Sequence, residues 1–136
     1  MNALEGVGLF LDTTVLITAA ENRDRHAWWI LYQSSARLYS NEYCMKELRY
    51  YLGRRRQLNQ QETNEVIESI RKKVIVLSTP QQSEYLKLDL PDKLKSDKPI
   101  VKSALDANLI LVTHDRLLHK EAKKYVKTST PQELVV

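Results

Sequence analysis

Two acidic residues at opposite ends of the sequence stand where a parallel sheet would bring their side chains together. Asp12 directly follows the apolar run 8–11, and Asp115 comes two residues after the apolar run 109–113. Ligands bind beyond the carboxyl ends of the strands in an open parallel sheet, so both carboxylates can face one crevice. Each aspartate also suits the cap of a following helix, which is the simpler structural interpretation.

Two further acids are candidates to join the same crevice. Asp97 stands at the expected start of a helix, where a carboxylate is tolerated and can be aimed at a shared point. Glu47 lies within an amphipathic helix. Their nearest competitors are Asp92 and Glu42, and because five residues separate Glu42 from Glu47, only one of those two is expected to reach the crevice.

Four carboxylates gathered in one place define the chemistry to expect. Without a counter-charge they would repel one another and some would take up protons, so a divalent cation is needed to neutralise them. Oxygen-only ligands favour Mg²⁺ or Mn²⁺. Such an ion activates a water for attack on a phosphodiester and stabilises the charge that develops on the phosphate.

Basic residues offer a weaker signal. The side chains of Arg54, Arg55 and Arg56 are candidates for RNA contacts, although a cluster at a helix end is more typical of a solvated terminus. His114 suggests a general base, but activation by a metal ion needs none, and its side chain is expected to point away from that of Asp115.

The elements that must position these residues alternate between strands and helices. Strands are expected at 8–11, 74–77, 109–113 and, at an edge, 125–127, and helices at 25–37, 41–52, 62–71, 80–88, from 96 or 97 onward and at 115–124. The runs 8–11 and 74–77 have the character of buried strands. This alternation predicts an α/β three-layer sandwich with a central parallel sheet of four to five strands.

Composition sets the broad class. The chain of 136 residues is 43% hydrophobic, and no linker divides it, which predicts one domain over 1–136. The net charge of +4 favours an anionic partner, nucleic acid before others. The single cysteine excludes an intrachain disulfide, and no secretory or membrane-spanning segment is evident, so a cytoplasmic protein with no membrane association is expected.

Five ordered segments carry a resemblance to a known family. They are LFLDTTVLI at 9–17, Ser40 through Glu47-Leu48, DKPIVKSA at 97–104, LVTHD at 111–115 and TPQE at 130–133. In this order and spacing they resemble the PIN domain family, the PilT N-terminal-like nucleases that include the VapC-type toxins. One departure is Thr14, where the family often has Asn or Ser, but a hydroxyl still makes polar contacts.

The resemblance implies a function. It implies a PIN-like fold and a Mg²⁺- or Mn²⁺-dependent endoribonuclease, with Asp12 and Asp115 as principal ligands and Asp97 and Glu47 completing the site. Thr13, Thr14 and Thr113 are expected to support these acids. For toxin members it also implies RNA as the substrate, a homodimer, and an antitoxin that blocks the acidic cleft.

Two other classes of function compete with this hypothesis. One is a catalytically silent PIN-fold module that binds RNA or protein, against which the full set of four acids argues. The other is a phosphatase of the haloacid-dehalogenase type, in which the aspartate after the first strand is a nucleophile. Those enzymes usually carry a second aspartate two residues later, where this chain has Thr14.

Overall fold

A parallel five-stranded sheet organises the structure, a computed structural model that describes residues 4–135. The strands are β1 (Gly8–Leu11), β2 (Arg37–Asn41), β3 (Ile75–Leu77), β4 (Ile110–Val112) and β5 (Thr128–Ser129), in the spatial order β3-β2-β1-β4-β5. The chain builds outward from β1 to β2 and β3, then returns to the other side of β1 with β4. The topological switch point therefore lies between β1 and β4.

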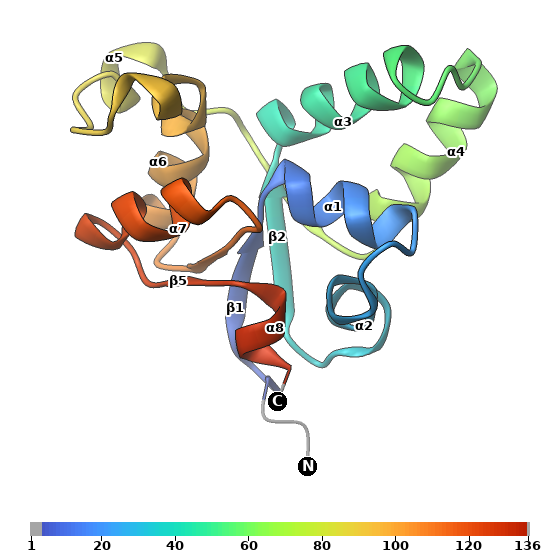
Figure 1. Ribbon diagram of the computed structural model, residues 1–136, viewed down its shortest axis with the longest axis horizontal. Coiled ribbons are helices and arrows are strands. Elements are labelled where there is room, and N and C mark those ends of the chain that lie inside the picture. The colour runs from blue at the N-terminus through green and yellow to red at the C-terminus, as the bar shows by residue number, and fades with distance from the viewer. Residues whose placement is uncertain (1–3, 136) are drawn as a thin grey trace.

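Helices cover both faces of this sheet. They are α1 (Thr13–Ala20), α2 (Arg25–Gln33), α3 (Glu42–Arg54), α4 (Gln60–Arg71), α5 (Gln82–Tyr85), α6 (Lys98–Asp106), α7 (Arg116–Glu121) and α8 (Pro131–Leu134), with 3₁₀ turns η1 (Asp92–Asp97) and η2 (Ala122–Lys124). Figure 1 shows α1 to α4 on the right of the sheet and α5 to α7 on its left. The expected α/β three-layer sandwich is thus confirmed.

The centre of the sheet is also the centre of the core. In β1, Leu9, Phe10 and Leu11 are fully buried, as are Leu111 and Val112 of the neighbouring β4. Strands covered on both faces need such continuous apolar runs, which is why these two gave the clearest sequence signals. Along residues 4–135, no helix combines the length and apolar character needed to span a bilayer.

Strand β2 was not expected from the sequence. The helix predicted over 25–37 ends at Gln33, and β2 occupies Arg37–Asn41. Its first residue is exposed, and two of its buried residues, Ser40 and Asn41, are polar, so neither the apolar run nor the alternation typical of a strand is present. The helix expected at 41–52 begins at Glu42, with Asn41 as its cap.

Other expectations were wrong in detail. The strand expected to be buried at 74–77 is the edge strand β3, in which Ile75 is 55% exposed. The last strand, expected at 125–127, is instead β5 at Thr128–Ser129. The helix expected at 80–88 shrinks to the single turn of α5. Short elements of this kind depend on tertiary packing more than on local pattern.

Candidate active site

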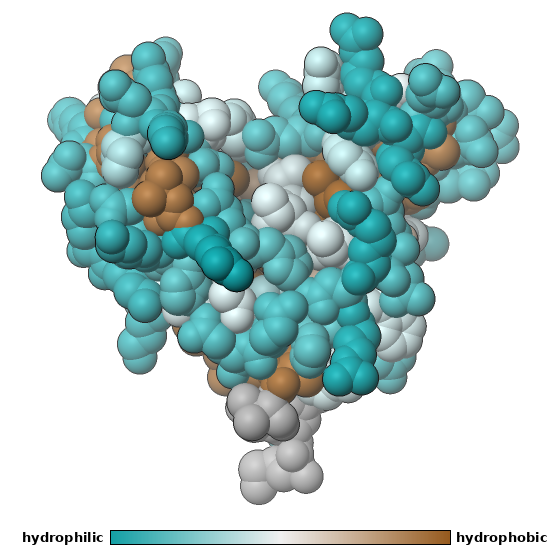
Figure 2. Space-filling view, in the orientation of Figure 1, coloured by the Kyte–Doolittle hydropathy of each residue, from teal (hydrophilic) through white to brown (hydrophobic). Residues whose placement is uncertain are grey.

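Polar side chains meet where β1 and β4 end, at the switch point of the sheet. Asp12 follows β1, its backbone N–H donates to the carbonyl of Val112 at 3.2 Å, and Asp115 follows β4. The Thr113 hydroxyl joins the two, because it donates to Asp12 Oδ2 at 2.5 Å and accepts from the Asp115 N–H at 3.0 Å. Figure 2 shows the surface hollowed above these strand ends, between the α5–α7 and α3–α4 sides.

The Asp12 carboxylate is fixed on both oxygens. Besides the Thr113 bond, its Oδ1 accepts from the Thr14 hydroxyl at 2.6 Å and from the Val15 N–H at 3.1 Å, which makes it the cap of α1. It is 2% exposed, and this burial raises its pKa above the ordinary 3.8, while the Thr113, Thr14 and Val15 hydrogen bonds work in the opposite direction. Capping and membership of the cluster therefore coexist in one side chain.

Glu47 reaches the same cluster from α3. Its Oε1 accepts a hydrogen bond of 2.6 Å from the hydroxyl of Thr13, the residue next to Asp12. Burial raises its pKa, and the Asp12 charge adds to this effect. The competing residue Glu42 instead pairs with Arg71 through contacts of 2.8 and 3.1 Å.

Asp97 completes the group at the start of α6. Its side chain makes no cap bond to that helix, unlike those of Asp12 and Asp115. Burial, and then the negative charges of Asp12, Asp115 and Glu47, raise its pKa to about 7. The structure thus brings Asp12, Asp115 and Glu47 within electrostatic reach of Asp97, whereas Asp92 is an exposed residue at the start of η1.

A buried amide holds the two helices that carry Glu47 and Asp97. Asn41 caps α3 by accepting from the Cys44 N–H at 2.9 Å, and its amide donates to Ser103 Oγ at 2.8 Å and to the Pro99 carbonyl at 3.3 Å. Both of those acceptors belong to α6. The sequence analysis missed this role of Asn41, although an asparagine directly before a helix is a signal for a cap.

Residues 9–124 match the PIN domain family. The chain belongs to this family. No curated protein matches the sequence significantly. Solved structures share this fold at low sequence identity.

Three of these structures illustrate the likeness. VapBC2 from Rickettsia felis is 11% identical, with 91% of this chain and 98% of that chain covered and a TM-score of 0.65. DNA-bound VapBC from Salmonella typhimurium is 17% identical, with coverage of 92% and 98% and a TM-score of 0.68. VapBC-1 from nontypeable Haemophilus influenzae is 21% identical, with coverage of 93% and 99% and a TM-score of 0.66.

The histidine beside the acids of this PIN domain turns toward other helices. His114 Nε2 lies 2.9 Å from the Thr18 hydroxyl in α1 and 3.3 Å from Asp24 Oδ2, the cap of α2. Its backbone N–H donates to the Thr14 hydroxyl at 3.2 Å. The side chain thus ties the loop after β4 to α1 and α2.

The arginine cluster lies at the far end of α3 from the acids. Arg56 Nε is 2.7 Å from Glu21 Oε2, and the Arg54 guanidinium lies 5.5 Å from the centre of the Tyr50 ring. Arg55 is the cap residue of the helix. Contacts between these three arginines and RNA remain a prediction.

The donor set of the site suits a hard cation. All four acids offer carboxylate oxygens, and their mutual repulsion is what a divalent charge would relieve. In the described part of the chain, no three His, Cys, Asp or Glu side chains are arranged closely enough to hold one ion together.

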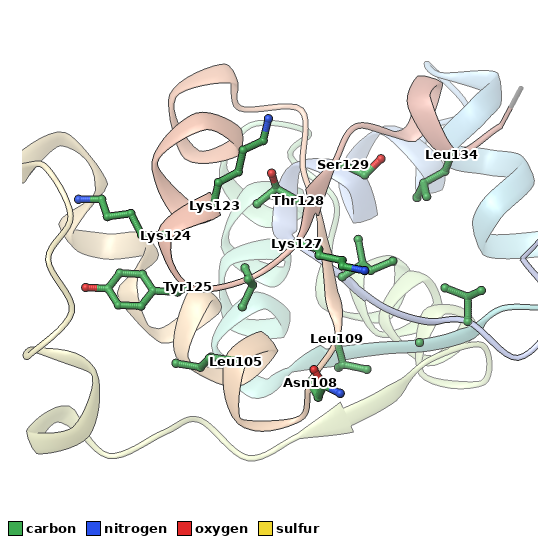
Figure 3. A pocket seen from close by; sticks show the side chains of 14 residues that line it. Leu105, Asn108, Leu109, Lys123, Lys124, Tyr125, Lys127, Thr128, Ser129 and Leu134 are labelled. Carbon is green, nitrogen blue, oxygen red and sulfur yellow. The ribbon is translucent and has the colours of Figure 1, made fainter.

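A cavity of this PIN domain lies at the other end of the sheet. It has a volume of about 940 Å³ and lies against β5 and the first residues of β1 and β4, the ends opposite to the acids. Figure 3 shows its labelled residues coming from the end of α6 and the turn after it, from the segment between η2 and the end of β5, and from α8. Lys123, Lys124 and Lys127 are among them. None of the four acids lines it.

Proposed function

We propose that this PIN domain is a metal-dependent endoribonuclease that hydrolyses RNA phosphodiester bonds. The observation that carries the proposal is the convergence of Asp12, Glu47, Asp97 and Asp115 from four elements. Burial raises the pKa of Asp12, and burial together with neighbouring negative charge raises the pKa of Glu47 and of Asp97. Keeping four acids so close is costly unless a cation is bound there. Mg²⁺ or Mn²⁺ is the proposed cofactor.

The proposed roles are those that the resemblance to the PIN family implies. Asp12 and Asp115 are the principal ligands, and the Thr113 hydroxyl bonds to the Asp12 carboxylate and to the backbone N–H of Asp115. Glu47 and Asp97 complete the site, and Thr13 holds Glu47 in place. A bound divalent cation supplies activation of water and neutralisation of charge on the phosphate. The fold supplies the fixed geometry, so the acids need little rearrangement during the reaction.

We also propose that the chain is the VapC-type toxin of a toxin–antitoxin pair. The similar structures from R. felis, S. typhimurium and H. influenzae are VapBC assemblies, the first two bound to DNA. Another similar structure is that of FitAcB from Neisseria gonorrhoeae. An antitoxin that covers the hollow between the two groups of helices, a homodimer and a cytoplasmic location belong to the same proposal.

Cleavage of labelled single-stranded RNA by the purified chain tests the nuclease proposal. We expect cleavage with Mg²⁺ or Mn²⁺ and none after addition of a chelator. Asp12→Asn should abolish cleavage, because it removes the charge at the centre of the cluster. The matched control is Asp106→Asn, the same substitution at the exposed end of α6, where the carboxylate pairs with Lys102 at 3.0 Å.

Two results would contradict the proposal. The parent chain could leave RNA intact with both cations, which would favour a catalytically silent module. Alternatively, Asp12→Asn could cut RNA as fast as Asp106→Asn, which would place the chemistry elsewhere. Circular dichroism of each variant separates loss of chemistry from loss of fold.

A further inference from the structure

A second cavity opens beside the acidic cluster. Its volume is about 400 Å³, within the range of roughly 300–1,000 Å³ typical of small-ligand pockets. Aromatic and polar residues of α3, α5 and the η1–α6 segment line it, among them Tyr43, Gln82, Tyr85, Ser96 and Pro99. None of these residues has a role in the cluster described above, apart from the Pro99 carbonyl that binds Asn41.

Tyr43 connects this cavity to the acids. It lies one helical turn before Glu47, and residues four apart on a helix share a face. Burial and then the charges of Glu47 and Asp97 raise the pKa of Tyr43 to about 12, so its ring lies within electrostatic reach of both acids. Ser96 and Pro99 also line the cavity, and they stand one residue before and two residues after Asp97 in the chain.

The lining suits a flat, partly polar ligand. Tyr43 and Tyr85 are both half-buried, so each has ring surface available to a partner while the rest of the ring is held by the fold. Aromatic faces of this kind stack on unpaired nucleobases. Gln82 carries both donors and an acceptor, and the Ser96 hydroxyl can do either, so the edge of a base would find hydrogen-bonding partners there.

We propose that this cavity binds one unpaired nucleobase of the RNA, adjacent to the cleaved phosphodiester, with Tyr43 as its stacking surface. The inference rests on the proposed nuclease function and extends it to the substrate. A base held here fixes the position of the neighbouring phosphate relative to Asp97 and Glu47. Single-stranded RNA is therefore the preferred substrate, since a paired base cannot enter the cavity.

The test compares three variants in steady-state cleavage of single-stranded RNA. Tyr43→Leu removes the ring and keeps apolar volume, and it should raise KM about tenfold or more with little change in kcat. Tyr43→Phe keeps the stacking face and should restore KM to within about threefold of the parent value. The control is Tyr50→Leu, the same change on an exposed tyrosine of α3 outside the cavity, which should leave both constants unchanged.

Binding without cleavage gives a second readout. With Ca²⁺ in place of Mg²⁺, removing the single base beside the cleavage position should weaken binding of the oligonucleotide to the parent chain. The same abasic oligonucleotide should bind to Tyr43→Leu as tightly as the intact one, since the ring that recognises the base is already gone. Thermal unfolding of Tyr43→Leu checks that the fold is retained.

Each outcome separates this inference from the nuclease proposal. An unchanged KM for Tyr43→Leu, or a fall in kcat alone, overturns the subsite, because the ring then either does nothing or only supports the acids. An equal loss in Tyr43→Leu and Tyr43→Phe overturns it as well, because stacking is then not the cause. If the parent chain cuts no RNA, the proposed function fails instead, whatever the variants do.

Discussion

The two ends of the sheet are surrounded by different kinds of side chain. At the carboxyl ends of β1, β2 and β4 lie the buried polar residues Asp12, Ser40, Asn41 and Thr113, whose hydrogen bonds join separate elements of the fold. At the opposite ends lies the larger cavity, whose lysines are exposed. If the functional site were chosen by cavity volume alone, the second region would be selected. Buried polar groups cost free energy unless they are paired, so the first region is the one that the fold is organised to hold.

One substitution at each end of the sheet tests this difference most directly. Asp97→Asn should lower kcat/KM for RNA at least about 100-fold, because a charge that faces the reacting phosphate is lost. Lys127→Gln, in the lysine-lined cavity, should change it by less than about twofold. Cleavage assays on both purified variants check this, and a comparable loss from Lys127→Gln would show that the opposite end takes part in the reaction.

Two asparagine helix caps, one buried and one exposed, can be compared to measure how much the buried polar network contributes to stability. Asn41→Ala should lower the free energy of unfolding by about 2–3 kcal/mol, since it removes the α3 cap and leaves groups of α6 without their partner. Asn59→Ala removes the exposed cap of α4 and should cost about 1 kcal/mol. Urea unfolding measures both, and equal costs would mean that the link to α6 contributes nothing.

The charge of the acidic end should be visible in the pH dependence of stability. Asp97 has a pKa of about 7 in the fold, above its ordinary 3.8, so its contribution favours the fold below about pH 4 and is lost as the pH rises to about 7. In a chelator at pH 8, Asp97→Asn should therefore be more stable than the parent by about 1–2 kcal/mol.

The same variant provides its own control at lower pH. At pH 5 the advantage of Asp97→Asn should shrink, because much of the aspartate is then protonated in the fold. Mg²⁺ should stabilise the parent at pH 8 more than it stabilises the variant. Unfolding curves at the two pH values decide the matter, and a pH-independent difference would contradict the electrostatic explanation.

The smallest expected effect concerns Thr14, which donates to Asp12 and accepts from the His114 N–H. Thr14→Val keeps the shape but loses both hydrogen bonds, and it should lower kcat about two- to tenfold. Thr14→Ser keeps the hydroxyl and should retain nearly full activity. Single-turnover cleavage rates measure the difference, and equal losses in the two variants would show that the methyl group, not the hydroxyl, matters.

Some of this architecture was predictable because strong local signals coincide with central positions. The runs before Asp12 and Asp115 are apolar because β1 and β4 are covered on both faces. The sequence therefore predicted both the ends of these strands and the acids that follow them. Strand β2 was not visible, because its buried residues Ser40 and Asn41 are chosen for hydrogen bonds to other elements and not for apolar packing.

Partners across the fold were equally out of reach of the sequence. Thr13 bonds to Glu47 across 34 positions, and nothing in the local pattern of either residue announces the other. The sequence left open whether Glu47 or Glu42 reaches the cluster, because the packing of α4 that brings Arg71 to Glu42 is a tertiary contact. The position of Tyr43, four residues before Glu47, could be read from the sequence. Its closeness to Asp97 depends on tertiary packing and could not.

The hydrogen bond from Thr113 to Asp12 spans 101 positions of the chain. During synthesis, Asp12 leaves the ribosome before β4, and it cannot be held in its final orientation until β4 has emerged and paired with β1. Before that point a nascent chain carries only scattered carboxylates. A ribosome making this chain would be exposed to the assembled cluster only after β4 has been made.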